Sequence, residues 1–326
     1  MGGSSKRETA AEEIMAFFPD TVRRILSQIP EDTWQNLEEI RLRIGQPLSI
    51  RLCQGDVFVS ESGDLLPSVT GSYRVTADDV YRATQLVTRS SLYSVEDELR
   101  NGFVTVSGGH RVGMAGKVLL EDRKIRTIKH VWALNFRVSR DVPGVADRIL
   151  PYLAERDRVK HTLIVSPPRC GKTTLLRDVV RQISYGIPVL GFRGVTVGVV
   201  DERSEIAGCY KGVPQRDVGP RTDVLDACPK AEGMLLLLRA FSPEVIATDE
   251  IGRKEDIAAL EEALNAGVTV IATVHARTIE ELKRRPALRY IMSLRVIERF
   301  ILLSNDKGPG TVREIIDGQT MKVLEA

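Results

Sequence analysis

Residues 166–174 read SPPRCGKTT and come close to the pattern of a phosphate-binding loop. That pattern requires a Gly, four free positions and then Gly-Lys-Ser/Thr, and Gly171, Lys172 and Thr173 match its second half. Ser166 stands where the first Gly is expected. An apolar strand precedes the loop and a helical pattern follows it, which is the strand–loop–helix order that phosphate binding requires. We therefore predict that this segment binds the phosphates of ATP.

Each part of the loop has a predicted role. The backbone N–H groups and the start of the following helix would face the phosphates. Lys172 would reach the β- and γ-phosphates, and the Thr173 hydroxyl would be a ligand of Mg²⁺. Because the first Gly usually supplies a φ that other residues avoid, Ser166 leaves altered affinity, or an inactive site, as an open alternative. The predicted contacts are Ser166, Pro167, Pro168, Arg169, Cys170, Gly171, Lys172, Thr173 and Thr174.

An acidic pair ends a second apolar strand. The segment PEVIATDE places Asp249 and Glu250 in succession. Asp249 would hold Mg²⁺ through water, and Glu250 would orient or deprotonate the attacking water. The alternative is a pair of solvated carboxylates that cap the next helix.

Two more strand ends carry polar groups. Asp201, Glu202 and Arg203 follow one apolar run, and His275 ends another after Thr273. The carboxyl ends of parallel strands open on one ligand crevice, so these groups are expected to converge with the phosphate loop. We predict that Glu202, Arg203 and His275 act at the site, with His275 sensing the nucleotide state.

The composition is that of a globular protein with about two domains. The chain has 326 residues, is 43% hydrophobic and carries a net charge of +2. So small a net charge produces no overall electrostatic attraction toward nucleic acid or an anionic membrane. No stretch approaches the ~20 apolar residues of a membrane span. Four cysteines without a CxxC pair indicate a reduced, cytoplasmic protein without a disulfide.

The pattern along the chain gives the expected domain organisation. We expect residues 1–9 to be a tag or disordered tail, and a mixed α+β domain over 10–142. Pro and Gly residues favour a linker over 143–158. Apolar strands alternating with helices from 159 to 326 predict a parallel α/β domain whose sheet is covered on both faces. Strands are expected at 161–166, 194–202, 244–250 and 267–276, with two or three more over 299–325 and a hairpin at 307–310.

These motifs resemble those of the secretion-type hexameric ATPases of type II and type IV secretion and pilus retraction. The DER, TDE and TVHA segments match that family's acidic, catalytic and histidine boxes. Before them, LEEIRLRIGQPL and GGHRVGMAGKV resemble its N-terminal domain, in the form found in endospore-forming bacteria. The resemblance runs from about residue 13 to 320. The family's tetracysteine element is absent, so we expect no structural metal.

The resemblance implies a RecA-like P-loop ATPase core of the type with an additional catalytic glutamate, and a homohexameric ring. Arg137 and Arg140, and also Arg111, are candidates to contact nucleotide from the N-terminal domain. The protein would be cytoplasmic, in the mother cell, and peripheral to a membrane platform protein rather than integral. It would hydrolyse ATP to power or assemble the channel between mother cell and forespore.

Two alternatives stay open. An ATP-binding scaffold with little hydrolysis would explain Ser166 in the loop. A nucleic-acid-stimulated P-loop translocase would need a basic channel lined by aromatic residues, and 5% aromatic content with near-neutral charge argues against nucleic acid as a partner. A small-molecule kinase is disfavoured because no acceptor lid is evident, and a GTPase because no Asn-Lys-x-Asp motif occurs.

Overall fold

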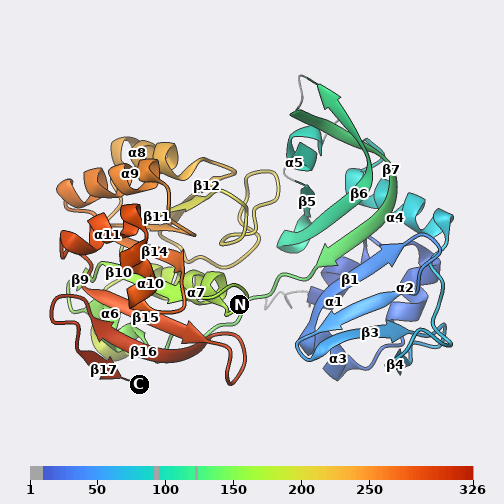
Figure 1. Ribbon diagram of the computed structural model, residues 1–326, viewed down its shortest axis with the longest axis horizontal. Helices are drawn as coiled ribbons and strands as arrows, with labels where there is room; N and C mark the ends of the chain where they lie inside the picture. The colour runs from blue at the N-terminus through green and yellow to red at the C-terminus, as the bar shows by residue number, and fades with distance from the viewer. Residues whose placement is uncertain (1–9, 92–94, 101, 122–123, 326) are drawn as a thin grey trace, which may run out of the picture. The chain divides into compact units, whose positions relative to one another are not determined.

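The computed structural model describes residues 10–91, 95–100, 102–121 and 124–325 (Figure 1). The tail expected over residues 1–9 lies outside these residues. The chain divides into two compact units, with the boundary between Arg140 and Asp141. Each unit has a sheet and a hydrophobic core of its own.

Unit 1 is built on a seven-stranded antiparallel sheet with the order β4-β3-β2-β1-β7-β6-β5. Its strands are β1 Leu37–Arg43, β2 Ser49–Leu52, β3 Gly55–Val59, β4 Leu65–Leu66, β5 Phe103–Val106, β6 His110–Glu121 and β7 Lys124–Arg137. Its helices are α1 Ala10–Met15, α2 Asp20–Leu26, α3 Glu31–Asn36, α4 Ala77–Thr88 and α5 Glu96–Arg100. The mixed α+β character expected for this part of the chain is present.

Local sequence signals explain several ends of these elements. Pro19 separates α1 from α2. Thr76, the N-cap of α4, forms a capping box with Asp79: its hydroxyl accepts a hydrogen bond from the Asp79 N–H at 3.1 Å, and the Asp79 carboxylate accepts one from the Thr76 N–H at 2.8 Å. In the core, the rings of Phe18 and Phe136 lie 4.4 Å apart.

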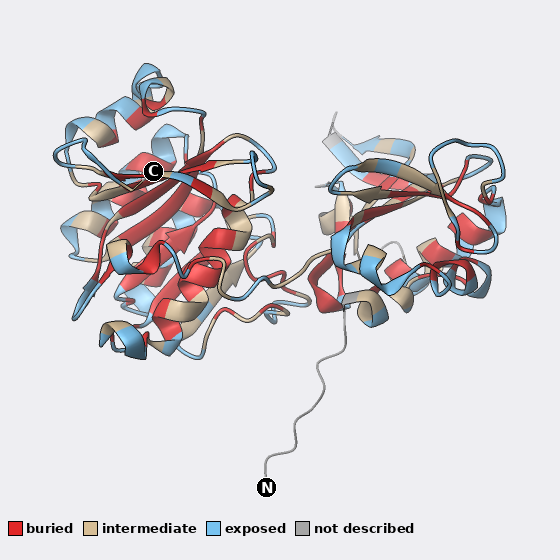
Figure 2. Cartoon of the chain, turned by 90° about the horizontal axis from the view of Figure 1, so that it is seen from below, coloured by how far each residue is buried: buried red, intermediate tan, exposed pale blue. Residues whose placement is uncertain are grey.

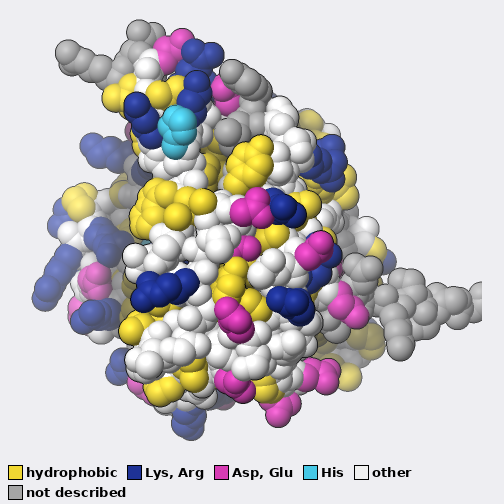
Figure 3. All heavy atoms as spheres, turned by 90° about the vertical axis from the view of Figure 1, so that its right-hand side faces the viewer, with side chains coloured by type: hydrophobic (Ala, Val, Ile, Leu, Met, Phe, Trp, Pro, Cys, Tyr) yellow, Lys and Arg dark blue, Asp and Glu magenta, His cyan; other side chains and the backbone are white. Residues whose placement is uncertain are grey.

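One face of the protein shows charged side chains of both signs. On the face shown in Figure 3, Lys and Arg side chains are interspersed with Asp and Glu and with single apolar side chains. This distribution agrees with the net charge of +2.

Unit 2 has an eight-stranded sheet with the order β12-β11-β13-β14-β10-β15-β16-β17. The first six strands in this order are parallel, and β16 and β17 are antiparallel additions. The strands are β10 Thr162–Ser166, β11 Val197–Asp201, β12 Thr222–Asp226, β13 Val245–Thr248, β14 Thr269–His275, β15 Arg299–Ser304, β16 Thr311–Asp317 and β17 Val323–Glu325. The helices are α6 Leu150–Leu153, α7 Lys172–Tyr185, α8 Lys230–Ala240, α9 Lys254–Asn265, α10 Ile279–Arg284 and α11 Pro286–Ser293.

Helices cover both faces of this sheet, so its central strands β10, β11 and β13 are buried on both sides (Figure 2). Ile164 of β10 belongs to the core on the α7 side, whereas Leu163 and Val165 belong to the core that includes α8 and α9. Alternate side chains of one strand therefore enter opposite cores. This explains the near-continuous apolar runs that predicted these strands.

The segment 143–158, for which a linker was expected, packs as part of unit 2. It contains α6 and the short strand β8 Ala154–Glu155, which pairs with β9 Arg158–Val159. Ala146 and Ile149 are fully buried. The Asp178 carboxylate of α7 accepts the N–H groups of Gly144 and Ala146 at 3.0 and 2.9 Å. Pro151, one of the linker signals, lies in the first turn of α6, where proline is tolerated.

The C-terminal strands have two different relations to the sheet. β15 pairs in parallel with β10, and β16 returns antiparallel to β15 through a turn at residues 305–310, which is the expected hairpin position.

Among the helices that the structure describes, none is both long enough and apolar enough to cross a membrane.

Candidate nucleotide site

The candidate site lies at the edge of the unit 2 sheet where the parallel strands β10, β11, β13 and β14 end, which we call the carboxyl edge. The strand order places β14 between β10 and β13. The phosphate-loop strand and the strand of the acidic pair are therefore not neighbours, and at about 4.8 Å per strand they lie about 10 Å apart.

The phosphate loop connects β10 to α7. Ser166 is the buried last residue of β10 and has extended backbone, so the position does not require glycine. The left-handed conformations occur later in the loop, at Arg169 with φ 63° and Gly171 with φ 82°. The Ser166 hydroxyl donates to the Pro167 carbonyl oxygen at 2.8 Å. The serine at this position therefore introduces no left-handed backbone strain.

Lys172, His275 and Glu250 form a continuous line of polar contacts across the carboxyl edge. Lys172 Nζ lies 2.9 Å from His275 Nδ1, and His275 Nε2 lies 3.3 Å from Glu250 Oε2. The strand register produces this line, because Ser166 at the end of β10 pairs with His275 at the end of β14. The structure thus brings together three residues predicted from separate motifs.

The Lys172 amine also donates to the loop itself. It lies 3.1 Å from the Pro167 carbonyl oxygen and 3.3 Å from the Ser166 hydroxyl. Burial lowers the pKa of Lys172, while the charge of Glu250 acts in the opposite direction. A lysine whose ammonium is partly desolvated in this way gains more from an anionic ligand than an exposed one does.

The acidic segment after β11 divides into residues with different surroundings. Asp201 is fully buried, and its carboxylate accepts the N–H groups of Glu205, Ile206 and Ala207 at 2.7–3.0 Å. Burial raises the pKa of Asp201 to about 6, against these hydrogen bonds. Asp201 therefore holds the loop after β11 in place and belongs to the framework of the site.

Glu202 and Arg203, the two predicted site residues of this segment, lie differently. The Glu202 carboxylate forms an ion pair with Lys230 and accepts a hydrogen bond from its ammonium group. Arg203 is exposed, and within the described part of the chain it makes no hydrogen bond or ion pair. The structure thus connects Glu202 with the carboxyl edge through Lys230. Since Arg203 makes no such contact with the other predicted site residues that the structure describes, its predicted role stays a prediction.

Asp249 and Thr173 fit the predicted magnesium ion by their chemistry. Both offer oxygen atoms, which Mg²⁺ prefers as ligands. Asp249 is buried at the end of β13, and its Oδ1 already lies 3.3 Å from a cation, the ammonium group of Lys230. Thr173 occupies the second position of α7, directly after Lys172. Asp249 is thus a buried carboxylate in surroundings that favour a positive charge.

The arginines expected to contact nucleotide from unit 1 already have partners there. The Arg140 guanidinium donates to the carbonyl oxygens of Trp34 and Gln35 at the end of α3. Arg111 lies over the Phe103 ring, 3.6 Å from its centre. Arg137 is 57% exposed and lies 4.0 Å from Glu39, so among these three it has the most freedom to reach a ligand.

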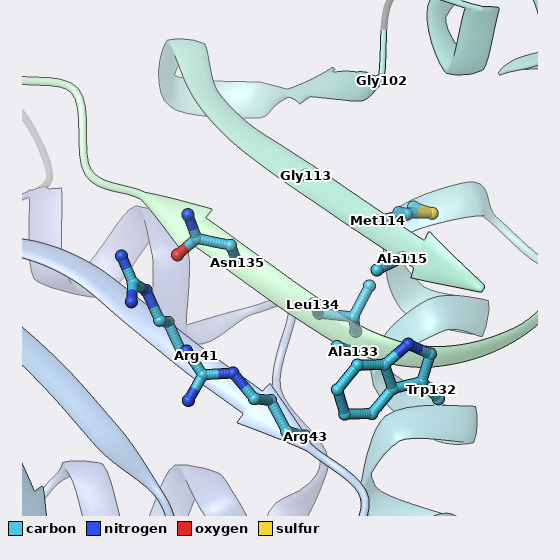
Figure 4. A pocket seen from close by; sticks show the side chains of 10 residues that line it. All are labelled: Arg41, Arg43, Gly102, Gly113, Met114, Ala115, Trp132, Ala133, Leu134 and Asn135. Atoms are coloured by element: carbon cyan, nitrogen blue, oxygen red, sulfur yellow. The ribbon is translucent and has the colours of Figure 1, made fainter.

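A hollow of about 360 Å³ opens on the sheet of unit 1, between β1, β6 and β7 (Figure 4). Arg41 and Asn135 lie at one end, where both contact the Glu39 carboxylate, at 3.0 and 3.3 Å. Trp132 closes the other end and is 47% exposed. No motif in the sequence predicted this hollow, because β1 and the hairpin of β6 and β7 lie far apart in the chain.

Comparisons with known proteins show the family to which this chain belongs. The family model for sporulation stage III, protein AA, matches residues 8–323. The chain belongs to this family. It is similar to stage III sporulation protein AA of Bacillus subtilis (strain 168), with 43% identity over 305 residues, which cover 94% of each chain. It is also similar to the protein SEEDLING PLASTID DEVELOPMENT 1 of Arabidopsis thaliana, with 25% identity over 86% of this chain and 36% of the plant protein.

Solved structures show the fold of this family member. The ATPase DotB of Yersinia pseudotuberculosis matches with a TM-score of 0.58 at 14% identity, covering 97% of this chain and 83% of that chain. DotB of Legionella pneumophila matches with a TM-score of 0.54 at 16% identity, covering 86% and 77%. The chain therefore has the fold of these ATPases, with the RecA-like core that the sequence predicted.

Two buried basic residues of the site were not predicted from the sequence. Lys230 was not singled out, although a lysine in the first turn of a helix opposes the helix dipole and is a usable signal. Arg177 of α7 donates to the carbonyl oxygens of Glu205 and Ile206 and thereby ties the phosphate-loop helix to the loop after β11. Its partners are backbone atoms, so no sequence pattern could reveal this contact.

Proposed function

We propose that this protein is a Mg²⁺-dependent ATPase that serves as the motor of a secretion-like apparatus in sporulation. ATP would bind at the carboxyl edge of unit 2, with its phosphates on the loop 166–174. The family match places the chain among sporulation proteins, and the fold is that of secretion-type ATPases. Hydrolysis itself and the role in powering or assembling a channel between mother cell and forespore are our inference.

The observation that carries the proposal is the line of contacts from Lys172 through His275 to Glu250. A lysine for the phosphates, a carboxylate for the attacking water and a histidine between them are the groups that ATP hydrolysis requires in one place. Lys172 begins α7, Glu250 follows β13 and His275 ends β14, so the parallel sheet gathers three separate segments of the chain. A purely structural histidine would not need both partners.

The chain's own residues would divide the work as follows. Loop N–H groups and Lys172 would bind the phosphates, and the lysine would exchange its contacts with Pro167 for phosphate oxygens. Glu250, whose side chain is 46% exposed, would accept a proton from the attacking water. His275 would transmit the change in its contact with Lys172 to Glu250 when the γ-phosphate leaves. Arg203 would sense that change from the exposed side of the site.

Thr173 and Asp249 are the residues that would hold Mg²⁺, Asp249 through water. When bound, the ion would neutralise negative charge that develops on the phosphate oxygens. The donor set is consistent with this assignment, because it contains only oxygen.

The assembly that we propose is a ring of six identical chains, peripheral to a membrane platform protein. Arg137 of unit 1 would complete the phosphate contacts, since it is exposed and only loosely held by Glu39. Arg140 would take part only if its contacts at the end of α3 were released.

The experiment that tests hydrolysis compares the wild-type chain with Glu250→Gln. Wild type should release phosphate from ATP in the presence of Mg²⁺, and loss of the general base should reduce the rate about 10²–10⁴-fold while ATP still binds. The matched control is Glu255→Gln, an exposed carboxylate five residues further on, in the first turn of α9, which should keep the wild-type rate. Hydrolysis by Glu250→Gln at the wild-type rate would falsify the catalytic role of Glu250. ATP binding without turnover by wild type would favour the scaffold alternative.

A further inference from the structure

A buried lysine lies between two carboxylates of the carboxyl edge. Lys230 Nζ pairs with the Glu202 carboxylate and lies 3.3 Å from Asp249 Oδ1. Only 8% of the Lys230 side chain is exposed. The cluster thus has two negative charges and one positive charge, all within one partly desolvated region.

Close packing of α8 on β11 puts the lysine there. A Cβ atom on Gly233 would lie 2.6 Å from a methyl carbon of Val200, and one on Gly198 would lie 2.8 Å from a methyl carbon of Leu237. Two glycines at the contact therefore let the helix approach the strand more closely than side chains would allow. The start of α8, where Lys230 stands, is held at the carboxyl edge as a result.

Helix stability does not explain a lysine at this position. Cations are disfavoured at the start of a helix, because the unpaired N–H groups there carry partial positive charge. Burial of an ammonium group is unfavourable as well. Both effects have to be offset by Glu202 and Asp249, so the position of Lys230 is defined by these two carboxylates.

We propose that Lys230 is a positioning residue whose ammonium group holds Glu202 and Asp249 in the metal-free protein and gives up Asp249 when Mg²⁺ binds. The inference rests on the proposed function only in taking Mg²⁺ as the ion for Asp249. Without a cation, the buried Asp249 carboxylate and the partly buried Glu202 carboxylate would repel each other and move apart, and the ends of β11 and β13 would move with them. With Lys230 in place, the carboxyl edge is already arranged before the ion arrives.

The arrangement has a consequence for metal binding. Mg²⁺ and an ammonium group repel each other, so both cannot stay close to Asp249. The ion therefore competes with Lys230, and the lysine raises the Mg²⁺ concentration that the site needs. Glu202 is the partner that would keep the ammonium group after the exchange, since its contact with Lys230 is the closer of the two.

The test is the thermal unfolding of Lys230→Gln without nucleotide, in EDTA and in MgCl₂ at matched ionic strength. In EDTA its Tm should fall below that of wild type, because two carboxylates lose their cation. Mg²⁺ should then raise the Tm of Lys230→Gln by about 3 °C or more beyond its effect on wild type. Lys230→Arg, which keeps the charge, should respond to Mg²⁺ as wild type does. Arg239→Gln, an exposed cation on the same helix, is the matched control and should also respond as wild type does.

An equal Mg²⁺ response of Lys230→Gln and wild type would overturn the inference. If Lys230→Gln does not fold, amine labelling of the wild-type chain followed by mass spectrometry decides. Lys230 should be protected in EDTA and more reactive in Mg²⁺, and unchanged labelling would contradict the exchange. These measurements contain no ATP, so they can fail while hydrolysis is observed, or succeed while it is not.

Discussion

The carboxylates at the carboxyl edge differ in burial and in their contacts, and these differences distinguish structural residues from candidate catalytic ones. Asp201 is fully buried and accepts three backbone N–H groups. Asp249 is buried beside a lysine, and Glu250 is nearly half exposed beside a histidine. A carboxylate that is to activate water needs access to water, whereas one that fixes a loop does not. These surroundings support Glu250 as the base and Asp201 as a structural residue.

The raised pKa of Asp201 predicts a specific pH dependence of stability. Since burial raises the pKa of Asp201 to about 6, the folded state holds its proton more tightly than the unfolded chain does. The stabilisation is complete below about pH 4 and is lost as the pH rises through about 6. Relative to Asp201→Asn, wild type should therefore lose up to about 3 kcal/mol of unfolding free energy between about pH 4 and pH 7.

Urea unfolding of both proteins across this pH range measures the effect. The difference between them, rather than either curve alone, isolates Asp201 from the other carboxyl groups. A difference that does not change with pH, or one that grows in favour of wild type as the pH rises, would mean that hydrogen bonds outweigh burial at this residue.

At the scale of residues, the sequence predicted the groups that carry recognisable chemistry. Lys172, Glu250 and His275 were expected to converge, and strand register brings them into contact. The conformation of the loop was not predicted, because Ser166 is extended and the left-handed residues are Arg169 and Gly171. Lys230 was not found, since its role depends on which carboxylates the fold places beside it.

At the scale of elements, the phosphate loop is packed against the C-terminal hairpin. The Gly310 N–H, in the turn between β15 and β16, donates to the Cys170 carbonyl oxygen at 2.9 Å. Gly171 has φ 82°, and a Cβ atom on it would lie 2.7 Å from the Gly310 nitrogen. The added antiparallel strands therefore support the loop, and Gly171 is required for both conformation and space.

Gly171→Ala should test this support. The left-handed backbone alone costs an alanine about 1–2 kcal/mol, and the contact with the Gly310 backbone adds to it. We expect Gly171→Ala to lose more than about 2 kcal/mol of unfolding free energy and to bind ATP more weakly. This loss should exceed that of the control variant by ~1 kcal/mol or more. The control is Gly267→Ala, because Gly267 has φ 77° and no atom within 4 Å of the added carbon. Urea unfolding measures both losses of unfolding free energy. Equal losses in the two variants would show that the hairpin adjusts to the added methyl group without destabilising the fold.

Strands were easier to predict than the connections between them. The buried strands β10, β11, β13 and β14 are apolar runs because both faces are covered. β12 was missed, since it lies at the edge of the sheet and reads TDVLD, without a buried residue. The segment 143–158 was expected to be a linker because of its Pro and Gly residues, but its apolar side chains enter the unit 2 core.

At the scale of the whole molecule, each unit has its own sheet and core, and the candidate groups are divided between the two. The phosphate loop and the carboxyl edge belong to unit 2, and Arg137 belongs to unit 1. A chain of this kind can complete its site by association with further copies of itself, and most such assemblies have closed symmetry. The proposed ring of six chains follows this principle and the family resemblance.

The most direct test of the central claim, that ATP·Mg²⁺ at the carboxyl edge of unit 2 organises a working ring, is the solution mass of Glu250→Gln by light scattering. This variant should bind nucleotide without consuming it. We predict a mass near that of the single chain, 36.2 kDa, without nucleotide, and about six times that mass with saturating ATP·Mg²⁺. A mass of 36.2 kDa with nucleotide bound would contradict the claim.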